Sequence, residues 1–341
     1  MTILHLTALF LLALLATHLL LKVTYRYALK HLLDTPNERS SHTIPTPRGG
    51  GIAVSLSSLA VLIYFAFTDT NLSTSELTLI AIASGTLAAL GYADDHLSLS
   101  RRLRFGVTLA ALAASVWLLP SPNLQLGHIT LTNSWILFPL LLLASTWFLN
   151  LFNFMDGIDG IASVQTLTAL IGAALILLSQ GEHNWSYLLI VLSAPALGFL
   201  IWNFPPAKIF LGDIGSYFWG TLIALLAITT AANTQLNIWS WIILLGVFIA
   251  DSSWTLTTRI LTKQQWNSPH RSHAYQKLSR RFNSHRTISL STGIITLLWL
   301  TPWAYASTQA ASTGWIFTIV AYIPLLLICR ASGAGRLELK D

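Results

Sequence analysis

The chain has 341 residues, of which 54% are hydrophobic and only 9% charged, and its mean hydropathy is +0.63. Because soluble domains carry about 25% charged residues, this composition excludes a water-soluble globular protein and indicates an integral membrane protein. The only cysteine, Cys329, excludes an internal disulfide and a cysteine-based metal cluster, and we interpret it as a small buried or lipid-facing residue.

Eleven apolar stretches follow one another along the chain, each close to the roughly 20 residues that a transmembrane helix needs. A cleaved signal peptide is the alternative for the first stretch, but its positive residues follow it rather than precede it. We therefore expect an all-α polytopic membrane protein that forms a single domain over residues 1–341. The expected spans lie near residues 3–21, 50–67, 77–92, 105–119, 135–149, 161–178, 185–202, 215–231, 238–256, 288–305 and 314–328.

The positive residues predict how these spans are oriented. If the N-terminus lies outside and the spans alternate, all 19 lysines and arginines fall on the inner side, whereas the outer loops 68–75 and 120–134 hold none. This is the positive-inside pattern, and it predicts a periplasmic N-terminus and a cytoplasmic C-terminus in a bacterial inner membrane. The net charge of +6 is therefore a topology signal, and no basic, aromatic-interleaved groove of the nucleic-acid-binding kind is visible.

Carboxylates at the inner membrane edge are the first candidates for chemistry, because they are costly there unless paired or metal-bound. Asp94 and Asp95 are adjacent at the inner end of the third expected span. A divalent cation or a shared proton would relieve their repulsion. The alternative is a solvated acidic pair that ends a helix.

A second polar cluster follows the fifth expected span, where Asn150, Asn153, Asp156 and Asp159 recur every three residues. If the segment is helical, these side chains share a face. Glycines after both aspartates would let a ligand approach the backbone closely. An ordinary turn would not need four polar side chains in register, so we interpret the cluster as part of a binding site.

Two further segments offer polar side chains beside a span. Asp213 lies just before the eighth expected span and is either a metal ligand or a helix N-cap. Arg48 precedes three glycines, a pattern that is typical of an anion cradle but also of a turn before a span.

The long inner loop 259–287 carries seven of the positive residues. Its residues His270, Arg271 and His273 are donors that suit phosphate, and a basic loop that touches anionic lipid is the alternative. Asp251, within the ninth expected span, fits a structural role in buried polar packing as well as catalysis.

Together and in this order, these motifs resemble the polyprenyl-phosphate N-acetylhexosamine-1-phosphate transferases, the MraY- and WecA-like enzymes of glycosyltransferase family 4. The resemblance covers about the first four fifths of the chain. Most members carry a His-x-His-His run in the last long inner loop; here His273 matches the first histidine, while Tyr275 and Gln276 replace the later two. This variant is similar to the WbpL-type branch that initiates O-antigen synthesis.

The resemblance implies that the chain transfers an N-acetylaminosugar 1-phosphate from a UDP-sugar to undecaprenyl phosphate, releasing UMP. This would be the initiating step of O-antigen or other cell-envelope polysaccharide synthesis, with Mg²⁺ or, alternatively, Mn²⁺ as the ion and the active site facing the cytoplasm. A homodimer is left open. A secondary transporter is the alternative function, but its sites would lie near the bilayer midplane between inverted repeats, and no repeat is visible.

The resemblance also implies roles for single residues. Asp213 and Asp94 would hold the metal, and Asp94 and Asp95 would face the lipid phosphate, one of them as a candidate base. Phe210 would stack on the uracil. The implied catalytic residues are Asp94, Asp95, Asp156 and Asp213, and the implied substrate-binding residues are Arg48, Asn153, Asp159, Phe210, His270, Arg271 and His273.

Overall fold

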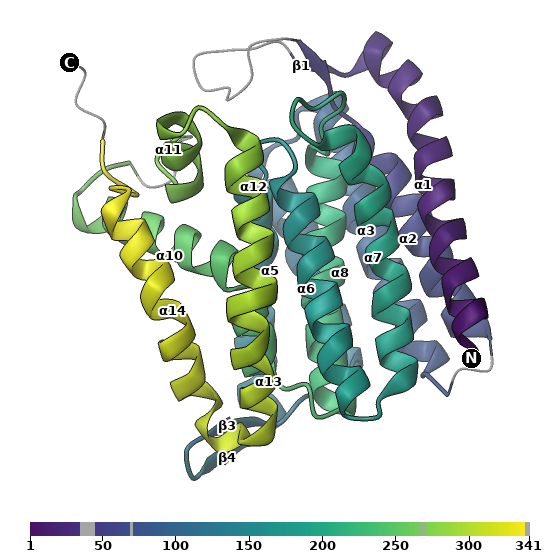
Figure 1. Cartoon of the computed structure of the whole chain (residues 1–341), viewed down its shortest axis with the longest axis vertical. Coiled ribbons are helices and arrows are strands. Elements are labelled where there is room, and N and C mark those ends of the chain that lie inside the picture. The colour runs from purple at the N-terminus through teal and green to yellow at the C-terminus, as the bar shows by residue number, and fades with distance from the viewer. Residues whose placement is uncertain (35–44, 69–70, 266–267, 269, 338–341) are drawn as a thin grey trace.

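The computed structural model describes residues 1–34, 45–68, 71–265, 268 and 270–337, and it confirms the all-α membrane fold (Figure 1). The described strands form two short antiparallel pairs, β1 (Leu33–Asp34) with β2 (Thr46–Pro47) and β3 (Leu124–Leu126) with β4 (Ile129–Leu131). The helices are α1 (Ile3–His31), α2 (Gly50–Phe67), α3 (Thr74–Leu97), α4 (Arg101–Leu118), α5 (Ser134–Met155), α6 (Ile161–Ser179), α7 (His183–Asn203), α8 (Gly212–Asn233), α9 (Ile238–Leu244), α10 (Gly246–Leu261), α11 (Ala274–Arg281), α12 (His285–Ile294), the π-helical η1 (Ile295–Leu300), α13 (Thr301–Gln309), the 3₁₀ turn η2 (Ala311–Thr313) and α14 (Gly314–Ala331).

Within the described residues, nine helices are long and apolar enough to cross a membrane, or ten if α9 and α10 form one bent span. The fourth expected span, 105–119, is not among them: it lies in α4, whose first turn holds three arginines and leaves a shorter apolar segment. The expected continuous span 238–256 is broken, because α9 and α10 meet at 77°. The Gln165 side chain of α6 donates to the Leu244 carbonyl oxygen at this break, 3.2 Å away, which satisfies a backbone group that lipid could not.

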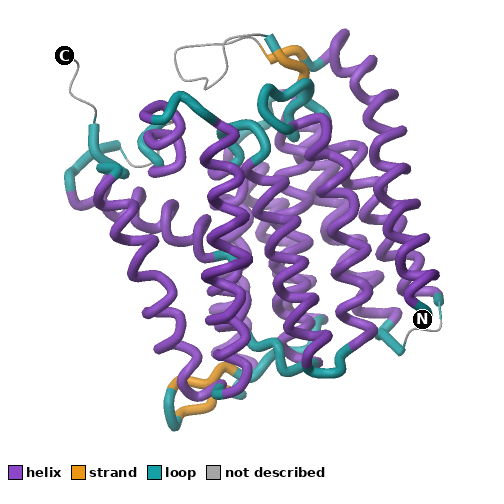
Figure 2. The backbone as a smooth tube through the Cα atoms, viewed as in Figure 1, coloured by secondary structure: helices purple, strands orange, loops and turns teal. Residues whose placement is uncertain are grey.

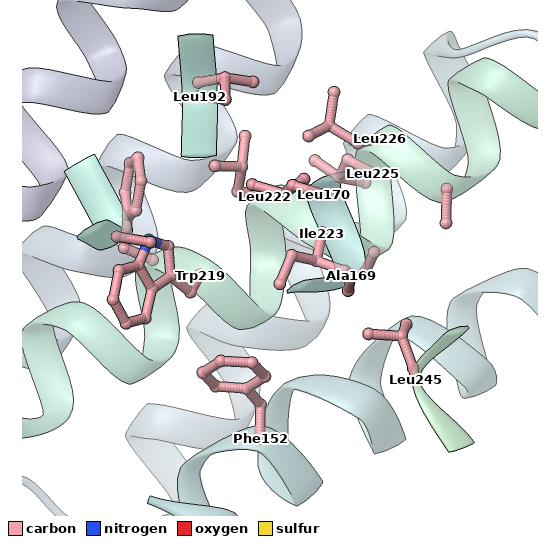
Figure 3. Close-up of a cluster of buried hydrophobic side chains, with 14 of the residues drawn as sticks. Phe152, Ala169, Leu170, Leu192, Trp219, Leu222, Ile223, Leu225, Leu226 and Leu245 are labelled. Atoms are coloured by element: carbon pink, nitrogen blue, oxygen red, sulfur yellow. The ribbon is translucent and has the colours of Figure 1, made fainter. Parts of the chain in front are cut away.

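Helix α8 is the centre of the bundle. In an apolar stretch of 18 residues of α8, 94% of the residues are buried. The corresponding share is 11% for α1 and 22% for the segment Ala311–Ala331, which includes α14. The close-up in Figure 3 shows Trp219, Leu222 and Ile223 of α8 among side chains of neighbouring helices, including Phe152 of α5. Since lipid tails are as apolar as these side chains, close packing rather than burial from water holds such helices together.

The two ends of the bundle differ. The pair β1–β2, helix α11 and the described segment after α14 lie at one end, whereas the N-terminus and the hairpin β3–β4 lie at the other (Figure 1). The backbone tube in Figure 2 shows that the loops gather at these two ends. The N-terminus and the described segment after α14 therefore lie at opposite ends of the bundle.

Candidate active site

A pocket of about 320 Å³ lies where α3 ends, α4 begins and α8 starts. Three aspartates and two arginines dominate its lining, and its volume is at the lower end of the range of small-molecule sites. The structure thus brings together three of the four predicted catalytic residues and the predicted Arg48. The lining residues are Arg48, Asp94, Asp95, Ser98, Leu99, Arg104 and Asp213.

Glycines position the start of α8 against two other helices. A Cβ at Gly91 of α3 would lie 2.5 Å from the Asp213 carbonyl oxygen, and one at Gly51 of α2 would lie 2.2 Å from the Gly215 nitrogen. Only glycine lets the backbones approach this closely. As a result, the first turn of α8, with Asp213, lies directly beside the end of α3, with Asp94 and Asp95.

Asp94 is buried and fully engaged. Its Oδ1 accepts a hydrogen bond from the Leu99 backbone nitrogen at 2.9 Å, and its Oδ2 forms a short ion pair with Arg104. The same guanidinium nitrogen of Arg104 lies 4.0 Å from Asp213 Oδ2. From the sequence, Arg104 was counted only as a residue that sets the membrane topology, yet in the structure its guanidinium pairs with Asp94 in the pocket.

The carboxylates of Asp95 and Asp213 line the side of the pocket where negative charge is less neutralised. Asp95 Oδ2 is buried and has no hydrogen-bond partner among the described residues. Asp213 Oδ1 accepts a hydrogen bond at 2.9 Å from the Asn153 amide, which also donates to the Ser216 hydroxyl at 2.8 Å. Asn153 therefore connects the end of α5 to the first turn of α8.

The segment before α2 reaches the pocket through its backbone and through Arg48. The Phe210 nitrogen donates to the Pro47 carbonyl oxygen, and the Gly50 nitrogen donates to the Phe210 carbonyl oxygen, both at 2.9 Å. The Arg48 side chain pairs with Asp34 at 2.7 Å and is 47% exposed. The stacking of the Phe210 ring on the uracil stays a prediction. Residues 35–44, which precede this segment, lie outside the described part of the chain.

The four polar residues that recur every three positions from Asn150 to Asp159 do not share one helical face. Helix α5 ends at Met155, and Asp156 has non-helical dihedrals of −85° and 51°, so the expected shared face is wrong. The amide of Asn150 donates to Thr146 of its own helix at 2.7 Å, away from the pocket residues. Burial raises the pKa of Asp156 well above its usual value, and the nearby charge of Asp213 raises it further.

Asp159 has three partners from distant elements. Its Oδ2 accepts from the Ala207 nitrogen at 3.1 Å, and its carbonyl oxygen accepts from Ser289 at 2.7 Å. His285 Nδ1 lies 3.4 Å from both the backbone nitrogen and the Oδ2 of Asp159. His285, at the start of α12, belongs to no predicted motif. The one signal in the sequence is that it is a histidine in the basic loop 259–287.

The predicted phosphate-binding loop is held from α10. His273 is buried, and its Nδ1 lies 3.3 Å from Asp251 Oδ1. The rings of His270 and His273 are 5.0 Å apart. Burial, followed by the charges of His273 and Arg259, lowers the pKa of His270 to about 4. His270 is therefore neutral near pH 7 and offers a hydrogen bond rather than a charge, while Arg271 is exposed.

The carboxylates of the pocket suit a divalent metal only in combination with further ligands. No group of three or more His, Cys, Asp or Glu within the described ranges could hold an ion by itself. Mg²⁺, however, is commonly held by one or two carboxylates together with substrate phosphates and water. The unpartnered Asp95 oxygen near Asp213 fits that pattern, whereas Arg104 occupies the oxygen of Asp94.

Several known proteins are similar to this chain in sequence. The model of glycosyl transferase family 4 matches residues 77–231. The chain is 31% identical over 330 residues to the probable undecaprenyl-phosphate N-acetylglucosaminyl 1-phosphate transferase of Bacillus subtilis (strain 168), covering 94% of this chain and 89% of that protein. It is 29% identical to the decaprenyl-phosphate N-acetylglucosaminephosphotransferase of Mycobacterium leprae (75% and 72% covered) and 30% identical to the phospho-N-acetylmuramoyl-pentapeptide-transferase of Prochlorococcus marinus (61% and 60%).

Proposed function

Because this chain belongs to glycosyl transferase family 4, we propose that it transfers an N-acetylaminosugar 1-phosphate from a UDP-sugar to undecaprenyl phosphate. The membership confirms the resemblance seen in the motifs and makes the chain a phospho-sugar transferase that acts on a polyprenyl phosphate. The choice of undecaprenyl phosphate, the sugar and the role as the first step of O-antigen or other envelope polysaccharide synthesis are our proposals, as is one transferase domain over residues 1–341.

The observation that carries the proposal is the pocket at the helix ends. Three carboxylates and two guanidinium groups line one small space, which suits phosphates and a divalent cation together. Asp95 lies two residues before the last residue of α3, and Asp213 is the second residue of α8. A lipid acceptor in the membrane and a nucleotide sugar in water could meet at such a helix end. A transporter site would instead be expected near the middle of the spans.

In the proposed reaction, an oxygen of the lipid phosphate attacks the β-phosphorus of the UDP-sugar. The bond from that phosphorus to the oxygen between the two phosphates breaks, and UMP leaves with that oxygen. Phosphoryl transfer depends mostly on positioning and on neutralisation of charge. Arg48 and Arg104 would hold phosphate oxygens, and His270, Arg271 and His273 would contact the pyrophosphate or sugar. Because a phosphate monoester is already largely ionised near pH 7, a carboxylate base would assist rather than decide the step.

Enzymes of this family generally depend on a divalent metal, and we propose Mg²⁺, with Mn²⁺ as a substitute. Asp213 and Asp95 are the ligands that the geometry favours, with Asp94 available if Arg104 moves. The ion would neutralise charge that develops on the pyrophosphate oxygens. Asn153, Asp156, Asp159 and Phe210 would form the nucleotide side of the site.

We further propose that the protein lies in the bacterial inner membrane with this pocket facing the cytoplasm. A Cys329→Ser background with a single cysteine at Ser121 or Asn283 tests the orientation. Ser121→Cys should react with an impermeant maleimide in intact cells, and Asn283→Cys should react only after lysis. Labelling of Asn283→Cys in intact cells would contradict the orientation.

The activity is tested with purified protein, undecaprenyl phosphate, Mg²⁺ and a panel of UDP-N-acetylaminosugars, by following UMP release. The names of the relatives make UDP-N-acetylglucosamine the first sugar to try. UMP release that requires both the lipid and the metal would support the proposal. No release with any sugar, from protein that stays monodisperse, would refute it. Transport in vesicles without UMP release would favour the transporter.

A further inference from the structure

Asp251 of α10 accepts hydrogen bonds from two directions. Within its own helix, Thr255 Oγ1 donates to its Oδ1 at 3.0 Å. From a segment more than 20 residues later, the Ala274 nitrogen donates to Oδ1 and the Tyr275 nitrogen to Oδ2, both at 2.9 Å. His273 Nδ1 lies 3.3 Å from Oδ1. The residue is only 4% exposed, so both of its oxygens are used inside the protein.

These contacts place the carboxylate at the N-terminus of α11. The first backbone N–H groups of a helix have no partner within it, and a negative charge at that end is stabilising. Helix α11 has only eight residues, and so short a helix is unstable by itself in water. Asp251 therefore caps the start of α11, beside the Gln276 side chain that accepts from the His273 nitrogen, and contacts the ring of His273.

A second residue of α10, Arg259, contacts the segment that leads from α10 to α11. Arg259 is 4% exposed, and its guanidinium donates to the Gln265 carbonyl oxygen at 2.6 Å and to the Gln264 side chain at 3.0 Å. It also lies 3.4 Å from Ser272 Oγ. The histidine-bearing loop is thus fixed to one helix at both of its ends.

The side chain of Tyr275 in α11 contacts residues 154–157, the segment that contains Asp156. The Tyr275 hydroxyl donates to the Phe154 carbonyl oxygen at 3.0 Å. The same hydroxyl would lie 2.1 Å from a Cβ at Gly157, on the far side of Asp156. Asn153, one residue before Phe154, donates to Asp213. A chain of direct contacts therefore runs from Asp251 through α11 to the residues beside the pocket.

We infer that Asp251 is a positioning residue, which fixes His273 and Tyr275 so that the histidine-bearing loop and the Asn153–Asp156 turn form one binding surface for the nucleotide sugar. The inference rests on the proposed function. Asp251 does not contact substrate in this role, because its oxygens are engaged by backbone and side-chain donors. The lipid acceptor is expected on the other side, at Asp94 and Arg104, so loss of Asp251 should affect one substrate more than the other.

The test is Asp251→Asn, which keeps the volume of the side chain but leaves one acceptor oxygen for the two backbone donors. We expect the KM for the UDP-sugar to rise on the order of 10-fold, because a buried donor loses its partner, while the KM for undecaprenyl phosphate stays near wild type. Amide exchange over 272–282 should become faster. Thr255→Val is the matched control, since it removes another donor to the same carboxylate without touching the loop, and it should change neither KM nor exchange.

Other outcomes overturn the inference. A lower kcat with unchanged KM values for both substrates would mean that Asp251→Asn only lowers the fraction of folded enzyme. Unchanged exchange over 272–282 would mean that Asp251 does not hold α11. If Asp251→Asn does not fold, Tyr275→Phe tests the same contacts from the other end, and a wild-type KM for the UDP-sugar in that variant would overturn the coupling. The exchange measurement needs no turnover, so it stays informative even if wild type releases no UMP and the proposed function fails.

Discussion

Asn153 and Asn150 have equal standing in the sequence but different partners in the structure, and this difference makes a sharp prediction. Replacing Asn153 by alanine removes the donor to Asp213 Oδ1 at 2.9 Å and the donor to Ser216 at 2.8 Å. A hydrogen bond to a charged group contributes about 1.5–3 kcal/mol, or roughly 10- to 150-fold in rate. Because the Asp213 side chain is 30% exposed, water can replace part of the bond. We therefore expect a loss of kcat/KM of roughly 10- to 30-fold, in the lower part of that range.

Asn150→Ala is the matched control, since it removes an amide from the same helix, one turn earlier, that donates to Thr146. It should keep kcat/KM near wild type. The assay is UMP release by purified protein in detergent at saturating Mg²⁺, with thermal unfolding measured on each variant. Asn153→Ala should also need more Mg²⁺ for half-maximal activity, because Asp213 is no longer oriented. Equal losses in the two variants, or wild-type kinetics in Asn153→Ala, would refute the reasoning.

Asp213→Asn should reduce UMP release to background without changing the thermal unfolding temperature, because an amide is a poor ligand for Mg²⁺; activity within a few-fold of wild type at high Mg²⁺ would count against the metal assignment. Arg271→Lys should lower kcat/KM on the order of 10-fold, because lysine cannot form two parallel bonds to a phosphate, whereas Arg281→Lys, at the exposed end of α11, should be silent; a silent Arg271→Lys would remove that residue from the site. His270 has a folded pKa of about 4 against an ordinary value of about 6.5, so the unfolded chain binds the extra proton and stability should fall as pH drops from 6.5 toward 4. The unfolding temperature of wild type should then fall more than that of His270→Gln over this range, and parallel curves would show that His270 is not buried as described.

His285 shows how a control chosen from sequence can fail. It lies outside every motif and would have served as an inert comparison for His273. In the structure its Nδ1 is 3.4 Å from Asp159, a predicted substrate-binding residue. Loss of activity in His285→Ala could therefore come from its contact with Asp159, so His285 is not an inert control for His273. Arg281 is the better control position within this loop.

The sequence determined the membrane fold and the residue types of the site. Hydropathy predicts spans because each helix must satisfy its own backbone hydrogen bonds in lipid, which is a local requirement. Hydropathy missed the break between α9 and α10, where a backbone carbonyl oxygen accepts a hydrogen bond from Gln165 of another helix. Asp94, Asp95 and Asp213 were recognisable because a carboxylate at a membrane edge needs a partner.

Only the tertiary structure decided who those partners are. Arg104 neutralises Asp94, Asp95 Oδ2 has no hydrogen-bond partner in the described part of the chain, and Asn153 rather than Asn150 reaches Asp213. These choices follow from how closely the helices approach one another, which depends on glycine contacts such as Gly91 against α8. Contacts of that kind join residues more than 100 positions apart, and neither hydropathy nor spacing along the chain carries information about them.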